Sequence, residues 1–223
     1  MKYSPYSYSK ISTYQQCPRK FKYKYIDKVK VPFVYSEALM KGGAVHHILE
    51  YHPEKSTHKY QEKYQNIADN FINSETGKLL FSLESKREMS IGLTENIEPC
   101  NYSDENVMLR GYVDYYTIYN DYLWIVDYKT GKLKDPRWQS YDQNLWYSIY
   151  FFKKFSKLNK IKITYQYVEH LDSDNSIILK RKYLDNYIKS LMINISNIEK
   201  DDKFNKSESK LCDYCDFKEI CLL

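Results

Sequence analysis

The sequence lacks any apolar run long enough to cross a membrane, which takes about 18 or more consecutive apolar residues. Residues 1–10 are polar and rich in tyrosine, so the apolar centre of a secretory signal peptide is missing as well. These absences predict a cytoplasmic protein with no membrane partner. With 43% hydrophobic residues, the chain has too much apolar surface to remain disordered.

A phosphate-binding P-loop is also missing. Gly131-Lys132 lacks the upstream glycine at the required spacing, and no Ser or Thr follows the lysine. The sequence therefore predicts that the protein itself uses no ATP.

Neither sign of charge is in large excess. The formal net charge is +5 and the pI is about 8.7. This permits a nucleic-acid partner without requiring one, because such binding depends on a local basic track more than on net charge. One such track interleaves lysines with aromatic rings over residues 19–30. We predict phosphate contacts from Arg19, Lys20, Lys22 and Lys24, with the rings stacking on bases. A charged helix or loop with a few core aromatics explains the run equally well.

The 223 residues are enough for one domain with a hydrophobic core, and we expect a single domain over residues 1–223. Alternating apolar and polar residues predict two strands, 107–119 and 122–130, joined by a turn at Asn120-Asp121. A second strand pair is predicted at 161–170 and 176–180, whereas residues 77–100 show no clear pattern.

Helical patterns flank these strands. Apolar residues at helical spacing predict helices over 36–52, 56–73, 137–155 (after Pro136) and 183–199, and a further helix that begins with Ser9 as its N-cap. Helices around a central mixed β-sheet make an α/β fold.

Two aspartates occupy facing positions in the first predicted strand pair. With the turn at 120–121, counting outward from the turn pairs Asp114 with Asp127. Their Cβ atoms would lie roughly 4.5–5.5 Å apart on one face of the sheet. Lys129, two residues beyond Asp127, would share that face.

Like charges directly opposite each other destabilise a sheet, and a divalent cation between them reverses the sign of the interaction. Carboxylate oxygens suit Mg²⁺ or Mn²⁺, which would polarise a phosphoryl oxygen and acidify a bound water. Lys129 would hold that water or neutralise charge in the transition state. The alternative is a pair of strand-end aspartates on a solvated face. The lysine at this offset favours the metal, although a register slip of one residue would separate the carboxylates.

Two weaker patterns lie on predicted helices. His46 and Glu50 are four residues apart and share a helix face, so the imidazole is a candidate to complete a metal shell. Gln143 and Tyr147 have the same spacing and are candidates to touch phosphate or bases. Taken alone, an ordinary surface His–Glu pair and an ordinary amphipathic helix explain both patterns better.

The C-terminal segment gathers three cysteines. Cys212, Cys215 and Cys221 lie within ten residues of one another, and Cys17 is the candidate fourth ligand. Four thiolates suit either zinc or a [4Fe–4S] cluster, and either would tie the N-terminal helix to the C-terminus. Cys100 is left over, and we predict that it is a buried thiol.

In this order, the motifs resemble the PD-(D/E)XK nuclease superfamily. The resemblance is strongest to its RecB-type branch with an iron–sulfur cluster, which includes CRISPR-associated exonucleases and the AddB-type nuclease domain. It runs over nearly the whole chain, through Ser7-Tyr8-Ser9, Tyr14, Cys17-Pro18-Arg19, Gly42 to Glu50, Gly111 to Asp114, Asp127-Tyr128-Lys129, Gln143 to Tyr147, and Cys212, Cys215 and Cys221.

The resemblance implies a restriction-endonuclease-like core and a role for each motif. The metal, Mg²⁺ or Mn²⁺, would be held by His46, Asp114, Asp127 and the Tyr128 backbone carbonyl. Lys129 would be the catalytic lysine, with Gln143 and Tyr147 in a supporting motif. The four cysteines would hold [4Fe–4S] and join segments 1–35 and 200–223 into one cluster-bound subregion.

The function expected from these residues is a metal-dependent DNA exonuclease that prefers single strands or DNA ends. A separate helicase or an integrase-type partner would supply any movement or integration step. The alternatives are an endonuclease selective for flaps or another DNA structure, and a non-cutting partner that binds DNA ends in adaptation or recombination.

Overall fold

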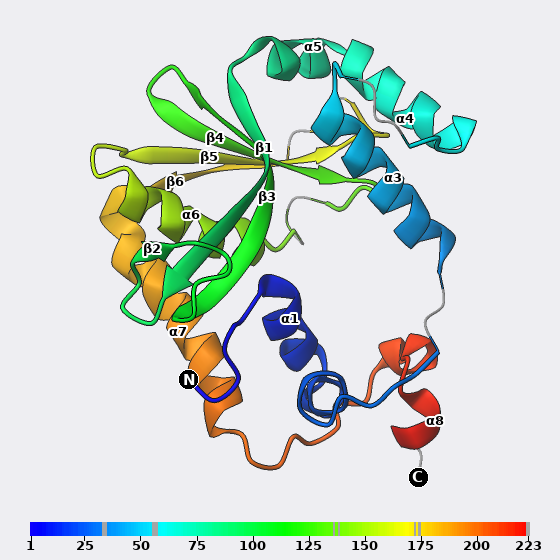
Figure 1. The fold of residues 1–223 in the computed structure, drawn as a ribbon, viewed down its shortest axis with the longest axis vertical. Helices are drawn as coiled ribbons and strands as arrows, with labels where there is room; N and C mark the ends of the chain where they lie inside the picture. The colour runs from blue at the N-terminus through cyan, green and yellow to red at the C-terminus, as the bar shows by residue number, and fades with distance from the viewer. Residues whose placement is uncertain are drawn as a thin grey trace.

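A six-stranded mixed sheet lies at the centre of the computed structural model, which describes residues 1–32, 35–54, 58–135, 137, 139–171, 173 and 175–221. The strand order is β2-β1-β3-β4-β5-β6, and only β4 and β5 run parallel. Helices flank the sheet (Figure 1), so the predicted α/β architecture with a mixed sheet is confirmed.

The strands are β1 (Ser85–Thr94), β2 (Pro99–Cys100), β3 (Val107–Tyr119), β4 (Tyr122–Lys129), β5 (Lys160–Tyr167) and β6 (Ser176–Lys180). The α-helices are α1 (Tyr8–Gln16), α2 (Pro18–Phe21), α3 (Glu37–Tyr51), α4 (Glu62–Asn73), α5 (Glu75–Ser82), α6 (Asp142–Lys154), α7 (Leu184–Lys200) and α8 (Lys218–Cys221). A π-helix, η1 (Lys22–Ile26), follows α2, and two 3₁₀ turns, η3 (Arg181–Tyr183) and η4 (Lys210–Tyr214), precede α7 and α8.

Two hydrophobic cores form on the sheet. One gathers buried residues of α1, α6 and α7 with strand residues such as Ile125 and Ile163. The other gathers residues of α3, α4 and α5 with Trp124 and Val126. Successive residues of β4 point to opposite faces, so this strand is buried by both cores. The chain thus places α3 and α6, which carry candidate site residues, on opposite faces of one strand.

The hairpin of β3 and β4 has the predicted register. Tyr119 pairs with Tyr122, and the ladder continues to Tyr115 and Val126. Asn120 in the turn has φ 53°, the left-handed conformation that such a turn requires. The β3–β4 ladder ends at that last pair, whereas β4 stays paired with β5 as far as Lys129. Strand β4 therefore leaves β3 at the position of Asp114.

Strand β1 is distorted at the same level. Arg87 pairs with Tyr115 and Met89 with Val113, which leaves Glu88 as the residue facing Asp114. Glu88 has φ 43°, an uncommon conformation for a residue with a side chain. On β3, Val113 packs in the core with α6 and Tyr115 in the core with α3. Asp114 therefore lies where β3 passes from one core to the other.

Some helix boundaries differ from the predictions. Helix α1 begins one residue before Ser9, because the Ser7 hydroxyl accepts the Lys10 amide at 3.2 Å and caps the helix. Helix α6 begins at Asp142, later than residue 137, and Pro136 lies outside the described residues. Helix α4 begins at Glu62, and residues 56 and 57 of its predicted first turn also lie outside them. The unassigned segment 77–100 contains most of α5 and all of β1 and β2.

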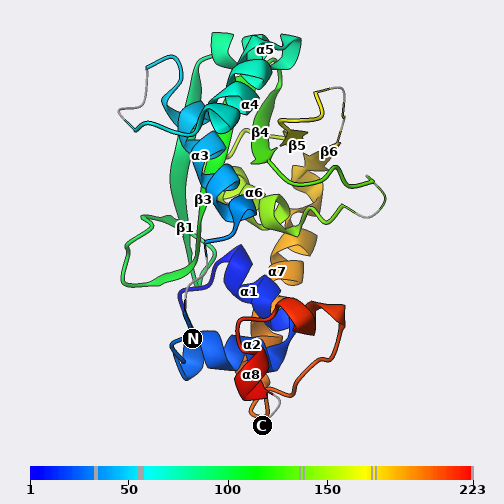
Figure 2. The same cartoon turned by 90° about the vertical axis from the view of Figure 1, so that its right-hand side faces the viewer.

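The N-terminal helices α1 and α2 lie near the C-terminal helix α8, in the part of the molecule below the sheet (Figures 1 and 2). The Tyr6 hydroxyl donates to Glu199 at 2.6 Å, and the Tyr14 hydroxyl donates to Asp201 at 2.8 Å. Arg19 Nε donates to the Phe204 carbonyl at 2.9 Å. These contacts join the N-terminal helices to the end of α7 and the segment that follows it.

Within the part of the chain that the structure describes, no helix has both the length and the apolar character needed to cross a lipid bilayer.

Gly111 leaves room for a ring of α6. A Cβ atom at this position would lie 2.2 Å from Cζ of Tyr147. Gly111→Ala should therefore cost about 1–3 kcal/mol of folding free energy by overpacking, a fall in Tm of roughly 2–10 °C in a thermal melt. Tyr147→Ala in the same chain should remove most of that additional penalty, because the new methyl group would no longer meet the ring.

Gly43 provides the matched control. It lies within α3, and a Cβ atom there would meet nothing within 4 Å. Gly43→Ala should leave the free energy of unfolding unchanged or raise it by about 1 kcal/mol. Equal effects of the two substitutions would show that Gly111 is not needed for this close approach.

Candidate active site

Three side chains from three elements converge near the point where β3 and β4 separate. His46 comes from α3, Glu88 from β1 and Asp114 from β3, and one ligand atom from each lies within 4.8 Å of the others. Nδ1 of His46 is 3.5 Å from Oδ2 of Asp114 and 3.9 Å from Oε1 of Glu88. One imidazole and two carboxylates form a donor set that suits a divalent metal ion.

The electrostatics of Asp114 fit such an ion. Burial, and next the nearby Asp127 carboxylate, raise the pKa of Asp114 to about 7, against the opposing charge of His46. Oδ2 of Asp114 also accepts a hydrogen bond from the Tyr128 amide at 2.8 Å. Without additional positive charge, this carboxyl group is only partly ionised at neutral pH. A cation would stabilise the ionised form.

The pKa of His46 is raised as well. Burial lowers its pKa, but the hydrogen bond with Glu88 and the charges of Asp114 and Asp127 outweigh burial and raise the pKa to about 9. Its Nε2 lies 2.9 Å from the Tyr128 carbonyl oxygen. In the metal-free protein, the protonated ring thus supplies positive charge to the carboxylates and donates to that carbonyl. The structure therefore brings together His46, Asp114 and the Tyr128 carbonyl, three of the groups that the resemblance implied as metal ligands.

Asp127 and Lys129 form the second half of the site. Their side chains are ion-paired, and Lys129 Nζ also lies 4.6 Å from the centre of the Tyr165 ring. Oδ1 of Asp127 accepts from Asn144 of α6 at 3.3 Å. Among the described residues, the buried Oδ2 has no hydrogen bond of normal geometry, and its charge partner is the Lys129 ammonium. Burial lowers the pKa of Lys129, but Asp127 outweighs this and raises it, so the lysine stays protonated.

Asp114 and Asp127 stand at facing register positions, one step beyond the last pair of the β3–β4 ladder. The Asp127 charge reaches Asp114, since it is the second largest cause of the raised Asp114 pKa. Asp127 is not one of the residues whose ligand atoms fall within 4.8 Å of one another, and Glu88 is. The carboxylates beside His46 are thus those of Asp114 and of Glu88 on β1, while Glu50 shares only its helix.

The two predicted residues of α6 lie at different depths. Gln143 is half-buried in the first turn, and the neighbouring Asn144 is the residue that contacts Asp127. Tyr147 is buried against Gly111 of β3. Burial raises the pKa of Tyr147, and the charges of Asp127 and Asp114 raise it further, so this ring lies beside the site.

The four predicted cluster cysteines line one cavity of about 360 Å³. It lies between α2, η4 and α8, and its lining includes Cys17, Cys212, Cys215 and Cys221. The Ser207 amide donates to the sulfur of Cys17 at 3.4 Å, and the Ser209 amide donates to that of Cys212 at 3.4 Å. Cys100, expected to be buried, is half-buried in β2.

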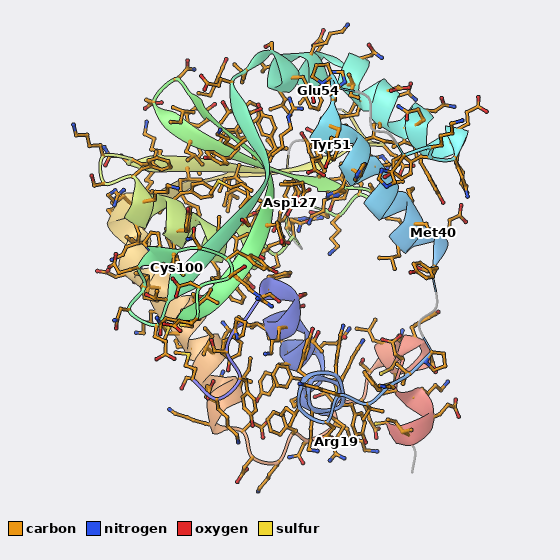
Figure 3. The ribbon with its side chains drawn as sticks, in the orientation of Figure 1. Arg19, Met40, Tyr51, Glu54, Cys100 and Asp127 are labelled. Atoms are coloured by element: carbon orange, nitrogen blue, oxygen red, sulfur yellow. The ribbon has the colours of Figure 1, made fainter. Side chains whose placement is uncertain are left out.

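The predicted phosphate-binding side chains mostly contact their own segment of the chain. Lys20 Nζ donates to Gln16, Lys22 is ion-paired with Asp27, and Lys24 Nζ lies 5.4 Å from the centre of the Tyr25 ring. Arg19 bonds the Phe204 carbonyl and lines the cysteine cavity with Lys20. Figure 3 shows Arg19 in the helical part below the sheet and Asp127 at the sheet itself, well separated in that view.

Sequence reasoning missed Glu88 and Asn144. Glu88 lies in the segment without a clear pattern, because β1 is buried along its second half and half-exposed along the first, which hides the alternation of a strand. Asn144 is one residue from the predicted Gln143. An acidic residue in a strand preceding the hairpin was the available signal, but only the pairing of β1 with β3 places it opposite Asp114.

Comparisons with known proteins concern the family and the fold. The model of the PD-(D/E)XK nuclease superfamily matches residues 5–222. Fourteen chains of solved structures match. One is the crystal structure of a "Putative exonuclease" from Eubacterium rectale, with 15% identity, a TM-score of 0.56, and coverage of 94% of this chain and 86% of that one. At that identity, the likeness concerns the fold alone. No curated protein matches the sequence.

Metal binding at this site should strengthen as the pH rises. The pKa values of Asp114, about 7, and His46, about 9, are both raised, so protons occupy these groups at low pH and a bound cation must displace them. The apparent Kd for Mn²⁺, measured by calorimetric titration, should fall about tenfold or more between pH 6 and pH 8. A Kd that does not change over this range would contradict the site.

Two glutamate variants locate the ion. Glu88→Gln should weaken Mn²⁺ binding, since it removes one negative ligand from the group around His46. Glu50→Gln is the matched control on the helix that carries His46, and it should leave the Kd unchanged. Equal effects of the two variants would place the ion elsewhere.

Proposed function

The chain belongs to the PD-(D/E)XK nuclease superfamily, and we propose that it is a metal-dependent DNA exonuclease that acts on single strands or DNA ends. The observation that carries this proposal is the convergence of His46, Glu88 and Asp114 within 4.8 Å of one another, at the edge of the ion pair between Asp127 and Lys129. A bound metal ion would polarise the phosphoryl group and activate a water, and a protonated lysine would stabilise the charge that develops during hydrolysis of a phosphodiester.

Each residue has a separate task in this proposal. His46, Glu88, Asp114 and the Tyr128 carbonyl hold Mg²⁺ or Mn²⁺, with Asp127 completing the negative charge of the site. When bound, the ion supplies Lewis acidity to the phosphoryl group and to an attacking water.

Lys129 holds the attacking water or neutralises the charge that develops on the phosphoryl oxygens. Asp127 on one side and the Tyr165 ring on the other restrict where its ammonium can lie. Asn144 fixes the Asp127 carboxylate, and the buried Tyr147 ring supports β3 at Gly111. Gln143, in the first turn of α6, is the residue left to contact the substrate.

The preference for ends rests on weaker support than the chemistry. One solved structure of similar fold carries the word exonuclease in its name. An endonuclease selective for flaps or other structures would use the same side chains. A non-cutting protein that binds DNA ends would not need Lys129 beside Asp127, so the ion pair favours an enzyme over a binding module.

We further propose that Cys17, Cys212, Cys215 and Cys221 hold a [4Fe–4S] cluster. All four thiols line one cavity, which supplies the ligand number that such a cluster needs. The amide hydrogen bonds to Cys17 and Cys212 would stabilise thiolates.

This cluster would make segments 1–35 and 200–223 one subregion of a single domain over residues 1–223. Arg19, Lys20, Lys22 and Lys24 remain the proposed contacts of this subregion with the DNA backbone. A separate helicase or integrase-type partner would supply ATP-driven movement or integration, since the sequence contains no P-loop.

Lys129→Ala should abolish cutting and preserve DNA binding. We expect the cleavage rate of end-labelled single-stranded DNA with Mn²⁺ to fall by about 100-fold or more. The Kd for the same DNA, measured by fluorescence anisotropy, should change by less than about threefold, because Lys129 is half-buried beside Asp127 and one charge contributes little to the total. Lys132→Ala, in the exposed segment after β4, is the control with the same change of charge. Cleavage that survives Lys129→Ala would refute its assigned role.

The choice of substrate separates the alternatives. An exonuclease should degrade end-labelled linear DNA and leave a circular single strand intact. Internal fragments from the circle would indicate an endonuclease. Absence of cleavage on single strands, duplexes and flaps with either metal would favour the non-cutting partner.

Anaerobically purified protein should be brown and contain iron and sulfide in equal amounts. Cys215→Ala should lose the colour, because the cluster loses one of its four ligands. Cys100→Ala removes the cysteine outside the cavity and should keep it. A colourless protein with one equivalent of zinc would contradict the cluster.

A further inference from the structure

An exposed aromatic pair with a cation lies beside the candidate active site. Tyr112 is on β3, two residues before Asp114, and its side chain is 49% exposed. Its ring centre lies 4.9 Å from that of Tyr102, with the planes inclined by 40°. The Arg110 guanidinium carbon lies 4.7 Å from the centre of the Tyr102 ring. We name Tyr102, Arg110 and Tyr112 the aromatic platform.

Tyr112 is exposed between two buried residues of its strand. Its neighbours Gly111 and Val113 are buried, the first against Tyr147 and the second in the core with α6. An exposed ring in such a strand contributes little to folding, because it removes little apolar surface from water. Its position therefore calls for an explanation other than packing.

Small residues on the neighbouring strand leave the platform uncovered. Ser90 of β1 pairs with Tyr112, and Gly92 pairs with Arg110. Cross-strand partners are the side chains closest to a residue in a sheet. Neither of these two can cover an aromatic ring or a guanidinium.

The platform lies about two stacked nucleotides away from the metal ligands. Two residues of strand span about 7 Å, and each nucleotide of a stacked strand advances about 3.4 Å. The distance from Asp114 to Tyr112 along β3 thus equals about two stacked nucleotides. A DNA strand whose scissile phosphate meets the ligands of β3 would bring a base over the platform.

We propose that the aromatic platform stacks a base of the substrate strand close to the scissile phosphate, with Tyr112 as the contact ring. This inference rests on the proposed nuclease function and adds a substrate-positioning residue to it. Tyr102 and Arg110 back the ring and hold its orientation. Arg110 adds a cation that attracts the adjacent phosphate. Every base has a π face, so such a platform favours single strands over paired ones without reading sequence.

Single-stranded DNA is the occupant that the location beside the metal ligands favours. A protein partner would also cover an exposed tyrosine, but it would not require Arg110 beside the ring or proximity to the metal ligands. The two occupants differ in one measurable respect. Only DNA stacking depends on the presence of a base at one position of the substrate.

The test is a double-mutant cycle that combines removal of the Tyr112 ring with removal of one base from the substrate. Cleavage of an end-labelled single strand with Mn²⁺ is measured for wild type and Tyr112→Ala, on intact DNA and on strands with one abasic residue moved through successive positions. Tyr112→Ala should lower kcat/KM about 5- to 100-fold, mainly through a higher KM. At one abasic position, wild type should suffer a similar loss, and Tyr112→Ala should show little further loss.

Conservative and control variants make the result decisive. Tyr112→Phe and Tyr112→Trp keep a stacking ring and should stay within about threefold of wild type. Ile118→Ala removes another exposed apolar side chain of β3, on the far side of Asp114, and should have no effect. A Tyr112→Ala enzyme within twofold of wild type would overturn the platform. So would abasic losses that are equal in both proteins.

Failure of the platform and failure of the nuclease proposal give different results. If wild type cuts and the cycle shows no coupling, only the platform is wrong. If wild type cuts no DNA, the nuclease proposal fails, and the same cycle is measured as equilibrium binding of the strands by anisotropy. Coupling in binding alone would keep the platform as a base-binding site, and its absence there would overturn the platform as well.

Discussion

The concentration of like charge where β1, β3 and β4 meet is the constraint on which the rest of the site depends. Glu88 and Asp127 occupy the register positions on either side of Asp114. Carboxylates at this spacing repel strongly when they are partly buried. His46 of α3 lies next to the carboxylates of Glu88 and Asp114, and Lys129 of β4 lies next to that of Asp127. These two side chains bring positive charge to the three carboxylates. A divalent cation at His46, Glu88 and Asp114 would remove the remaining repulsion.

The backbone also departs from regular sheet geometry at this position. The β3–β4 ladder stops one step before Asp114, and the Tyr128 amide bonds the Asp114 carboxylate. Glu88 adopts φ 43°, a conformation that costs about 1–3 kcal/mol and persists only where the surroundings impose it. Regular strands on each side supply that constraint. The pairing of β3 with β4 is therefore interrupted at the position of the candidate metal ligands.

Helix α1 connects this site to the cysteine cavity. Near its start, the Tyr8 ring packs 5.9 Å from that of Trp146 in α6, and Tyr8 contributes to raising the pKa of Lys129. At its end, Cys17 forms the C-cap and lines the cavity. A helix of nine residues is about 13 Å long and rigid on this scale. Any ligand that fixes Cys17 therefore also fixes the helix that borders Lys129, the proposed catalytic lysine.

The sequence alone determined the hairpin and the residues that it carries. With a two-residue turn at Asn120-Asp121, counting along two adjacent strands placed Asp114 opposite Asp127 and Lys129 two residues beyond it. The close spacing of Cys212, Cys215 and Cys221 likewise marked them as a group. The predicted helix starts were wrong where a single capping residue or a loop sets them, as at Ser7 before α1 and at the start of α6.

Tertiary structure alone decided the ligands that come from distant elements. Glu88 became a candidate ligand because β1 pairs with β3, a contact that no local pattern encodes in a strand without alternation. Asn144 reached Asp127 because α6 packs across β4, and Tyr112 stayed exposed because its partners on β1 are small. Local periodicity reports which face a residue occupies. Which other element covers that face depends on how the whole chain packs.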